Sequence, residues 1–142
     1  MEGISSEAAS LAGTLGLSKL ILIYDDNDIS IEGNTDIAFR ENVGERFKAY
    51  NWNVIKVDDG SDIAKVGEAI EKAKSESDKP SVIISKTTIG FGAPNAGTAG
   101  VHGSPLGKEG IKGLKKNLNW NYEEDFYVPE EVKEHMKEIQ KS

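Results

Sequence analysis

Apolar and polar positions along this chain follow two periods, one typical of buried strands and one typical of amphipathic helices. Short apolar runs bounded by turn residues predict strands at residues 20–25, 53–57 and 81–86. Apolar residues at helical spacing lie between the runs. The clearest of these helices has Asp62 as its N-cap and a face formed by Ile63, Val66, Ile70 and Ala73. Alternating strands and helices favour right-handed βαβ crossovers, so we expect an α/β fold, a parallel sheet with helices on both faces.

Two segments near the start of the chain are expected to be enclosed. Residues 5–17 are rich in alanine and leucine and have little polar face, which predicts a mostly buried helix. The continuous apolar run at residues 20–25 predicts a fully buried strand of the kind found in parallel sheets. Further helices are predicted at residues 43–50, at 108–118 and after Pro129, the last with an apolar face formed by Val132, Met136 and Ile139.

Composition narrows the classes of function. The chain has 142 residues and no cysteine, which excludes disulfides, thiolate metal sites and cysteine nucleophiles. Its formal net charge of −7 opposes the approach of nucleic acid. The longest aliphatic run is residues 20–23, and the first residues carry neither a basic nor an apolar signal region. We therefore expect a cytoplasmic protein with no nucleic-acid or membrane partner.

The most informative stretch is the polar cluster that follows the first predicted strand. Asp25, Asp26, Asn27 and Asp28 come directly after the apolar run. Ligands of α/β sheets bind outside the carboxyl ends of the strands, and Asp and Asn offer the hard oxygens that Mg²⁺ and Ca²⁺ require. The segment therefore indicates a metal and phosphate site. The alternative is a plain turn, because Asp and Asn also end strands by bonding their own backbone.

A glycine-rich loop at residues 90–103 follows the third predicted strand. It does not match the dinucleotide fingerprint, because Asn95 occupies the position of the third glycine, and the chain has no P-loop motif. Glycines at such a position still let backbone N–H groups approach phosphate oxygens, and His102 could add a donor. The alternative is a mobile surface loop with an incidental histidine.

A second class of function is suggested by Asp26, Asp28 and Ser30. Their spacing after an apolar strand resembles the first motif of the haloacid-dehalogenase phosphohydrolases, in which the first aspartate is a nucleophile and the second a general acid. Those enzymes also need a later strand that ends in an acidic pair. The pair Asp58 and Asp59 comes too early in the chain for that role, so this interpretation lacks its structural context.

Four separated motifs together decide between these interpretations. They are residues 2–8 (EGISSEA), 24–33 (YDDNDISIEG), 86–92 (KTTIGFG) and 101–107 (VHGSPLG), and in this order and spacing they closely resemble transketolase. The resemblance covers essentially the whole chain. It implies that residues 1–142 are part of the N-terminal, diphosphate-binding (PP) domain of a thiamine diphosphate enzyme of the pentose phosphate pathway, which moves a two-carbon ketol unit between sugar phosphates.

The resemblance also implies roles for individual residues. Asn27 would bind Mg²⁺ or Ca²⁺ through its side-chain oxygen, and Ile29 through its backbone carbonyl. His102 would contact both the diphosphate and the substrate, and Ile31 and Ile89 would pack near the thiazolium ring. Two acidic residues correspond to those that run toward the dimer contact of a homo-oligomer, namely Glu2 and Glu7. Sugar phosphates, and a pyrimidine-binding domain or companion chain, would be the partners.

The chain also departs from the family pattern. Transketolases carry a Gly-Asp-Gly metal motif shortly before the segment that begins here at Glu2, and a pyrimidine-binding domain supplies the activating glutamate. Neither is present in this sequence, and Glu32 replaces the usual aspartate. Two hypotheses stay open. The chain is either part of a transketolase that is inactive by itself, or a non-catalytic remnant or interaction module that has lost cofactor binding.

Overall fold

The computed structural model describes residues 3–141. Helices alternate with the three strands of the main sheet as the sequence predicts, and a short two-stranded hairpin at residues 29–34 was not predicted. The elements are α1 (Gly3–Thr14), β1 (Ile21–Asp26), β2 (Ile29–Ser30), β3 (Gly33–Asn34), the 3₁₀ helix η1 (Thr35–Ile37), α2 (Val43–Ala49), β4 (Asn53–Val57), α3 (Ile63–Ser75), β5 (Ser81–Lys86), the 3₁₀ helix η2 (Ala99–Val101), α4 (Gly107–Asn117) and α5 (Glu130–Ile139). Glu2, one of the residues expected at a dimer contact, lies outside the described residues.

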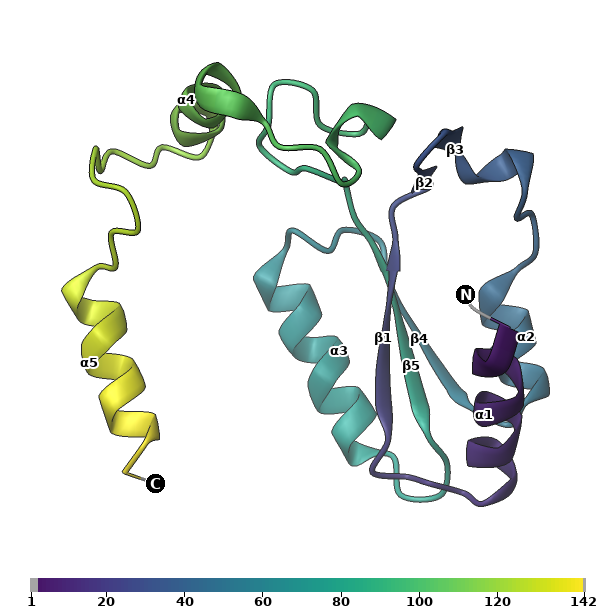
Figure 1. Ribbon diagram of the computed structural model, residues 1–142. Coiled ribbons are helices and arrows are strands. Elements are labelled where there is room, and N and C mark those ends of the chain that lie inside the picture. The colour runs from purple at the N-terminus through teal and green to yellow at the C-terminus, as the bar shows by residue number, and fades with distance from the viewer. Residues whose placement is uncertain (1–2, 142) are drawn as a thin grey trace. The chain divides into compact units, whose positions relative to one another are not determined.

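Three parallel strands form the main sheet in the order β1-β5-β4. The register aligns their ends, because Ile21 and Asn53 both lie opposite Ser81, and Asp26 lies opposite Lys86. Helix α3 covers one face of the sheet, and α1 and α2 cover the other (Figure 1). The predicted α/β fold with helices on both faces of a parallel sheet is confirmed.

The chain divides into two compact units. One comprises residues 1–91 and 95–105, and the other comprises residues 92–94 and 106–142. The first contains the sheet with α1, α2 and α3, and the second contains α4 and α5. In the second unit, the Asn117 side-chain amide donates to the Gly92 carbonyl oxygen at 2.9 Å. Among residues 3–141, no helix is both long enough and apolar enough to cross a lipid bilayer.

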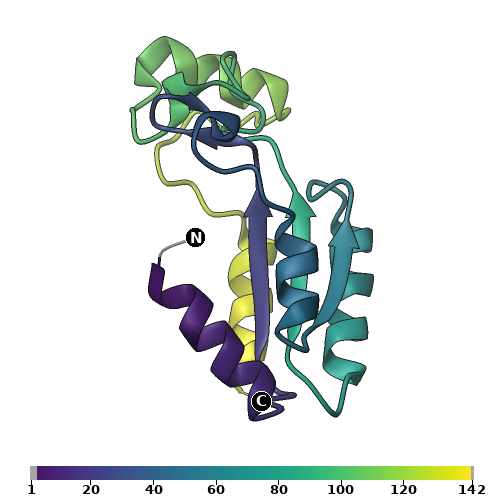
Figure 2. The ribbon, with the colours of Figure 1, turned by 90° about the vertical axis from the view of Figure 1, so that its right-hand side faces the viewer.

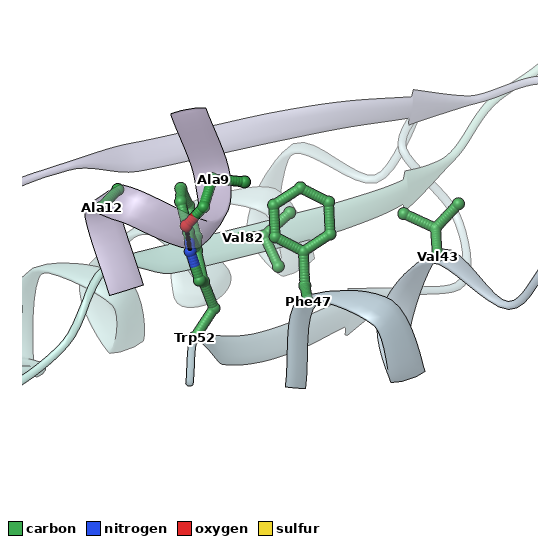
Figure 3. Packing of buried hydrophobic residues seen from close by; sticks show 6 residues of the cluster. All are labelled: Ala9, Ala12, Val43, Phe47, Trp52 and Val82. Atoms are coloured by element: carbon green, nitrogen blue, oxygen red, sulfur yellow. Dashed lines mark hydrogen bonds between the residues drawn. The ribbon is translucent and has the colours of Figure 1, made fainter. Parts of the chain in front are cut away.

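The central strand β5 supplies core residues to both faces of the sheet. Successive side chains of a strand point in opposite directions, so Val82 and Ile83 enter different clusters. Val82 packs with residues of α1 and α2 and with Trp52, as Figure 3 shows. Ile83 packs with Val57 of β4 and with two alanines of α3, Ala69 and Ala73. The two clusters hold helices on both faces of the strands whose carboxyl ends form the candidate site.

Burial of the first helix and strand differs from the prediction. Strand β1 lies at an edge of the three-stranded sheet, and Leu22 and Ile23 are exposed, so it is not the fully buried strand that its apolar run predicts. Helix α1 buries Ala9, Ala12 and Gly13, while Leu11 is 58% exposed, so the expectation of a mostly buried helix is also wrong. Only one stripe of α1 faces the sheet, because its helical turns present the remaining side chains away from it.

Two of the predicted apolar helix faces are only partly buried. In α3, Val66, Ile70 and Ala73 belong to the core cluster with Ile83, as predicted. Ile63 is 87% exposed, because it occupies the first helical position after the Asp62 N-cap and does not reach the sheet. In α5, the predicted apolar residues stay about half exposed, namely Val132, Met136 and Ile139.

Candidate functional site

The candidate site begins in the turn between β1 and β2. Asn27 directly follows β1, and its side-chain oxygen Oδ1 accepts a hydrogen bond at 2.9 Å from the backbone N–H of Ile29. Asp28 between them has a φ of 60°, a left-handed conformation that Asp and Asn tolerate better than most residues. The Asp28 carbonyl oxygen accepts a hydrogen bond from the backbone N–H of Thr35 at 2.9 Å. The turn therefore holds the Asn27 side-chain oxygen beside the Ile29 backbone N–H.

Residues at the end of β5 hold the same turn from the neighbouring strand. The Lys86 ammonium lies 2.5 Å from an Asp28 carboxylate oxygen and 3.5 Å from an Asp26 carboxylate oxygen. The Thr87 hydroxyl donates to Asp25, and the Thr87 backbone N–H donates to the Asp26 carbonyl oxygen at 3.2 Å. Aligned parallel strands place their last residues at one edge, which explains why these groups meet despite their separation along the chain.

Charge and burial shift the pKa values of Lys86 and Tyr24 near the carboxyl ends of these strands. A hydrogen bond from Lys86 to Asp28 raises the pKa of the Lys86 ammonium above its ordinary value, and the charge of Asp26 adds to this rise. Lys86 is therefore protonated throughout the neutral range. Burial raises the pKa of the Tyr24 phenol, and the carboxylates of Asp26, Glu41 and Asp28 act in the same direction.

A cavity of about 470 Å³ opens beside the turn. Its wall contains Asn27 and Ile29 together with two basic side chains, Arg40 and Lys56. The Arg40 guanidinium donates a hydrogen bond to the Asp36 carbonyl oxygen at 2.6 Å. The structure thus places the two expected metal ligands on a polar cavity at the carboxyl end of β1, where α/β folds bind ligands.

The loop after β5 carries the other expected cofactor residues. The backbone N–H of Gly97 donates to the Ile89 carbonyl oxygen at 2.9 Å, which closes the loop on itself. Gly90 has a φ of 65° and packs so closely on Val101 that a Cβ atom there would lie 2.9 Å from the Val101 side chain. Ile89 and His102 are the chain neighbours of Gly90 and Val101, so they flank the two residues of this contact. His102 is half-buried and follows η2, and its backbone N–H donates to the Ala99 carbonyl oxygen at 3.0 Å.

The remaining site predictions fall on exposed positions. Ile31 lies between β2 and β3 and is 69% exposed, and Glu7 is exposed on α1. Figures 1 and 2 both show the β2–β3 hairpin and the loop that follows β5 beyond the same end of the sheet. Residues expected around one cofactor therefore come from two loops at the carboxyl end of the sheet.

The donor set at the turn fits a hard divalent cation in part. An amide oxygen has two lone pairs, and Asn27 Oδ1 uses one for the Ile29 N–H, so one stays available for a cation. Residues 3–141 contain no group of three or more His, Cys, Asp or Glu side chains arranged to hold a metal. Mg²⁺ takes six oxygen ligands in an octahedron, so the neutral oxygens of Asn27 and Ile29 have the right chemistry but must be joined by others.

Comparison with known proteins places the chain in a family. The family described as "Transketolase, thiamine diphosphate binding domain" matches residues 1–142. This chain belongs to the transketolase family. It is 61% identical over 136 residues to the transketolase of Bacillus subtilis, covering 95% of this chain and 20% of that protein. It is 52% identical over 138 residues to the transketolase of Geobacillus stearothermophilus, covering 96% of this chain and 21% of that protein.

Solved structures of the transketolase family share the fold. The transketolase of Pichia stipitis in complex with sedoheptulose-7-phosphate superposes with a TM-score of 0.92 at 49% identity, covering 99% of this chain and 22% of the other. The transketolase of Campylobacter jejuni gives a TM-score of 0.88 at 45% identity, covering 94% of this chain and 21% of the other. The chain thus spans about a fifth of the length of the transketolases that it matches.

Sequence reasoning did not assign a role to Lys86 or Thr87. Both belong to a motif that carries the family resemblance, yet neither was expected to contact the aspartates after β1. A signal was available, since Lys86 ends a predicted strand parallel to β1 and the carboxyl ends of parallel strands meet at one edge. The register that places Lys86 opposite Asp26 is what the sequence pattern could not supply.

Proposed function

We propose that this chain forms part of a transketolase that transfers a two-carbon ketol unit between sugar phosphates with thiamine diphosphate. Within that enzyme it contributes contacts to the diphosphate and to its metal ion. The observation that carries the proposal is the turn that pairs Asn27 with Ile29 at the carboxyl end of β1, in a chain that matches the thiamine diphosphate-binding domain throughout residues 1–142.

The metal ion is Mg²⁺ or Ca²⁺ in this proposal. Asn27 would bind it through Oδ1, and Ile29 through its backbone carbonyl. A cation at this position offsets the repulsion between a diphosphate and a chain whose formal net charge is −7. The donors are neutral, so the diphosphate oxygens and further ligands would have to complete the coordination.

The loop after β5 would complete the cofactor contacts. When bound, thiamine diphosphate supplies the chemistry that breaks and forms the carbon–carbon bond. His102 would contact the diphosphate and the substrate, with an imidazole N–H as a hydrogen-bond donor. Ile31 and Ile89 would pack near the thiazolium ring, and the exposure of Ile31 leaves its apolar side chain accessible to such a ring.

The proposed enzyme also contains polypeptide other than residues 1–142. A homo-oligomer, with a pyrimidine-binding domain or a companion chain, would bring the activating glutamate to the cofactor. Glu2 and Glu7 would lie near the dimer contact, and the exposure of Glu7 beside the exposed apolar residue Leu11 on α1 supports a contact there. We propose that the chain by itself does not catalyse ketol transfer, since it spans only about a fifth of its relatives.

The second candidate is a non-catalytic interaction module that has lost cofactor binding. One observation favours it: the part of the chain that the structure describes holds no metal-binding group of acidic or histidine side chains. Cofactor affinity separates the two candidates, because a cofactor-binding part of a transketolase would still hold the metal ion through Asn27 and Ile29 and contact the diphosphate through His102.

Titration calorimetry with thiamine diphosphate and Mg²⁺ tests the proposal. We expect weak binding by the chain, with a dissociation constant of ~0.1–1 mM, because two neutral oxygens replace a complete ligand set. Asn27→Ala should remove this binding. Asn53→Ala is the matched control, since Asn53 lies at the opposite end of the sheet and bonds Ser81. Binding that survives Asn27→Ala would contradict the assignment, and no binding by the unmodified chain would favour the interaction module.

Activity is tested with xylulose 5-phosphate and ribose 5-phosphate in a coupled assay, on protein free of host enzyme. We expect no turnover by the chain alone, because general acid–base activation of the cofactor needs a group that the site residues do not provide. Turnover above background that disappears in His102→Ala would show that the chain is active by itself.

A further inference from the structure

Side chains at the end of β5 contact the aspartates around Asn27, and we call this arrangement the cross-strand latch. It comprises Asp25, Asp26 and Asp28 on one side and Lys86 and Thr87 on the other. Asp26 and Lys86 lie opposite each other in the parallel register, so their side chains share a face of the sheet. Asp28 lies two residues beyond Asp26, with Asn27 between them.

Lys86 contacts the carboxylates on both sides of Asn27. Its ammonium lies 2.5 Å from Asp28 and 3.5 Å from Asp26. Asp28 carries the left-handed φ of 60° that redirects the chain, and the next residue donates its N–H to Asn27 Oδ1. Because the Lys86 ammonium contacts both ends of the turn, it restricts the two backbone segments that determine where Asn27 Oδ1 points.

Thr87 extends the latch to the Asn27 side chain itself. The Thr87 hydroxyl donates to Asp25 Oδ1, and the same oxygen lies 3.4 Å from Asn27 Nδ2. The Asn27 amide is thus in contact with Asp25 through its nitrogen and with the Ile29 N–H through its oxygen. These two contacts orient the amide so that its oxygen, and not its nitrogen, lies beside the Ile29 backbone.

The ion pairs of the latch make the aspartate carboxylates less suitable than the Asn27 amide as ligands of a divalent cation. Two carboxylates already share one ammonium, and a divalent cation bound to them would be repelled by Lys86 at close range. The neutral Asn27 amide carries no such positive partner. The acidic cluster is therefore suited to hold the turn, and the amide between the two aspartates has no ammonium partner that would oppose a bound cation.

We propose that Lys86 is a positioning residue, whose ammonium between Asp26 and Asp28 holds the turn that presents the oxygens of Asn27 and Ile29. Where the metal is concerned, this inference rests on the proposed function. Because Thr87 begins the loop that carries Ile89 and His102, the same contacts link the two loops on which the cofactor residues lie.

Amide hydrogen exchange followed by NMR tests the latch in the chain without metal or cofactor. Lys86→Met removes the charge and keeps much of the length of the side chain. The reporters are the Ile29 N–H, which bonds Asn27, and the Thr35 N–H, which bonds the Asp28 carbonyl. Exposed ion pairs have small effects, so we expect both amides to exchange ~3- to 5-fold faster, with no change at Val82 and Ile83 in the core.

Three further variants make the test specific. Lys86→Arg keeps the charge and should restore exchange to within about two-fold of the unmodified chain, given the size of such effects. Asp28→Asn tolerates the left-handed backbone and should accelerate exchange as Lys86→Met does, with little additional effect when the two are combined. Lys74→Met is the matched control, because it removes a similar exposed contact, Lys74 to Glu71 at 2.7 Å, on α3.

The outcomes separate this inference from the proposed function. Unchanged exchange at Ile29 and Thr35 in Lys86→Met would overturn the inference, as would equal acceleration in the core or failure of Lys86→Arg to restore protection. The same samples are then titrated with Mg²⁺ and thiamine diphosphate, and we expect Lys86→Met to bind ~3- to 5-fold more weakly. Unchanged affinity would refute the positioning role. Absence of any response at Asn27 in the unmodified chain would refute the proposed function and leave the exchange result standing.

Discussion

Trp52 joins helix α1 to the sheet, and its replacement by phenylalanine should destabilise the first unit. The side chain is 5% exposed, and its indole N–H donates to the Ala9 carbonyl oxygen at 2.8 Å in the core. Its ring packs edge-on against Phe47, with centroids 5.0 Å apart. Figure 3 shows Trp52 between α1 and the Phe47 ring. Trp52→Phe therefore removes a buried hydrogen bond and leaves part of this space unfilled.

The magnitude follows from these two losses. The lost indole hydrogen bond costs about 0.5–1.5 kcal/mol, because the Ala9 carbonyl oxygen lies inside α1 and keeps its helical backbone partner. The smaller phenyl ring leaves a space next to Phe47 and Ala9, which adds about 1 kcal/mol if the neighbours relax only in part. We expect the free energy of unfolding to fall by about 1.5–2.5 kcal/mol, a large share of the ~5–15 kcal/mol that stabilises a typical domain.

The chain offers a matched control and a separate fluorescent reporter for each unit. It has two tryptophans, and the second, Trp120, lies in the second unit, where it is 39% exposed and packs against Tyr122. Trp120→Phe should cost less than ~0.5 kcal/mol, because the site is partly exposed and Trp120 is not in the core. Trp52→Phe keeps a tryptophan only in the second unit, so the urea midpoints of the two variants are compared by circular dichroism, to which the sheet and helices of the first unit contribute. Fluorescence then reports separately on the unit that retains its tryptophan in each variant.

One result would refute this reasoning. If Trp52→Phe lowers the urea midpoint no more than Trp120→Phe does, with an unchanged dependence on urea, then the buried hydrogen bond to Ala9 does not contribute to stability. A changed dependence on urea in Trp52→Phe would instead show that the variant alters the compactness of the folded or unfolded state, and the comparison would then need an independent calorimetric measurement.

Two further predictions concern close packing and exposed surface. Gly13→Ala should lower the free energy of unfolding by at least ~1–3 kcal/mol, because the added Cβ would overlap the Tyr50 carbonyl oxygen. The matched variant Gly67→Ala has open space in α3 and should stabilise the chain by ~0.5–1 kcal/mol. Thermal melting of both variants tests this, and equal melting temperatures would contradict it. The chain should self-associate between ~1 and 100 μM in light scattering, because it exposes large apolar side chains, and a monomer across that range would show that this surface does not drive association. The exposed residues include Ile4, Leu11, Leu15, Leu17, Leu22 and Ile23.

Local patterns in the sequence determined most of the secondary structure. The strands at residues 53–57 and 81–86 were predicted with the bounds that the structure shows, because short apolar runs there end in turn residues. The start of α3 was predicted from Asp62, whose carboxylate accepts hydrogen bonds from the backbone N–H groups of Ala64 and Lys65. Capping and periodicity depend on neighbours within a few residues, so the sequence alone is sufficient for them.

The family, and Asn27 as a candidate site residue, could also be predicted from the sequence, through motifs that lie in order along the chain. The burial of individual strands and helices could not. An apolar run such as residues 20–25 is compatible with a central or an edge strand, and only the order β1-β5-β4 decides that β1 lies at the edge with Leu22 and Ile23 exposed. Strand order depends on contacts between distant segments, which hydrophobic periodicity does not encode.

The surroundings of the candidate site were decided by tertiary structure for the same reason. The sequence places Asp25, Asp26 and Asp28 around the end of a strand, but does not indicate which basic side chain contacts them. The parallel register brings Lys86 opposite Asp26, although the two residues are far apart along the chain. Local chemistry therefore determined the turn around Asn27, and the alignment of two strands determined which residues hold that turn in place.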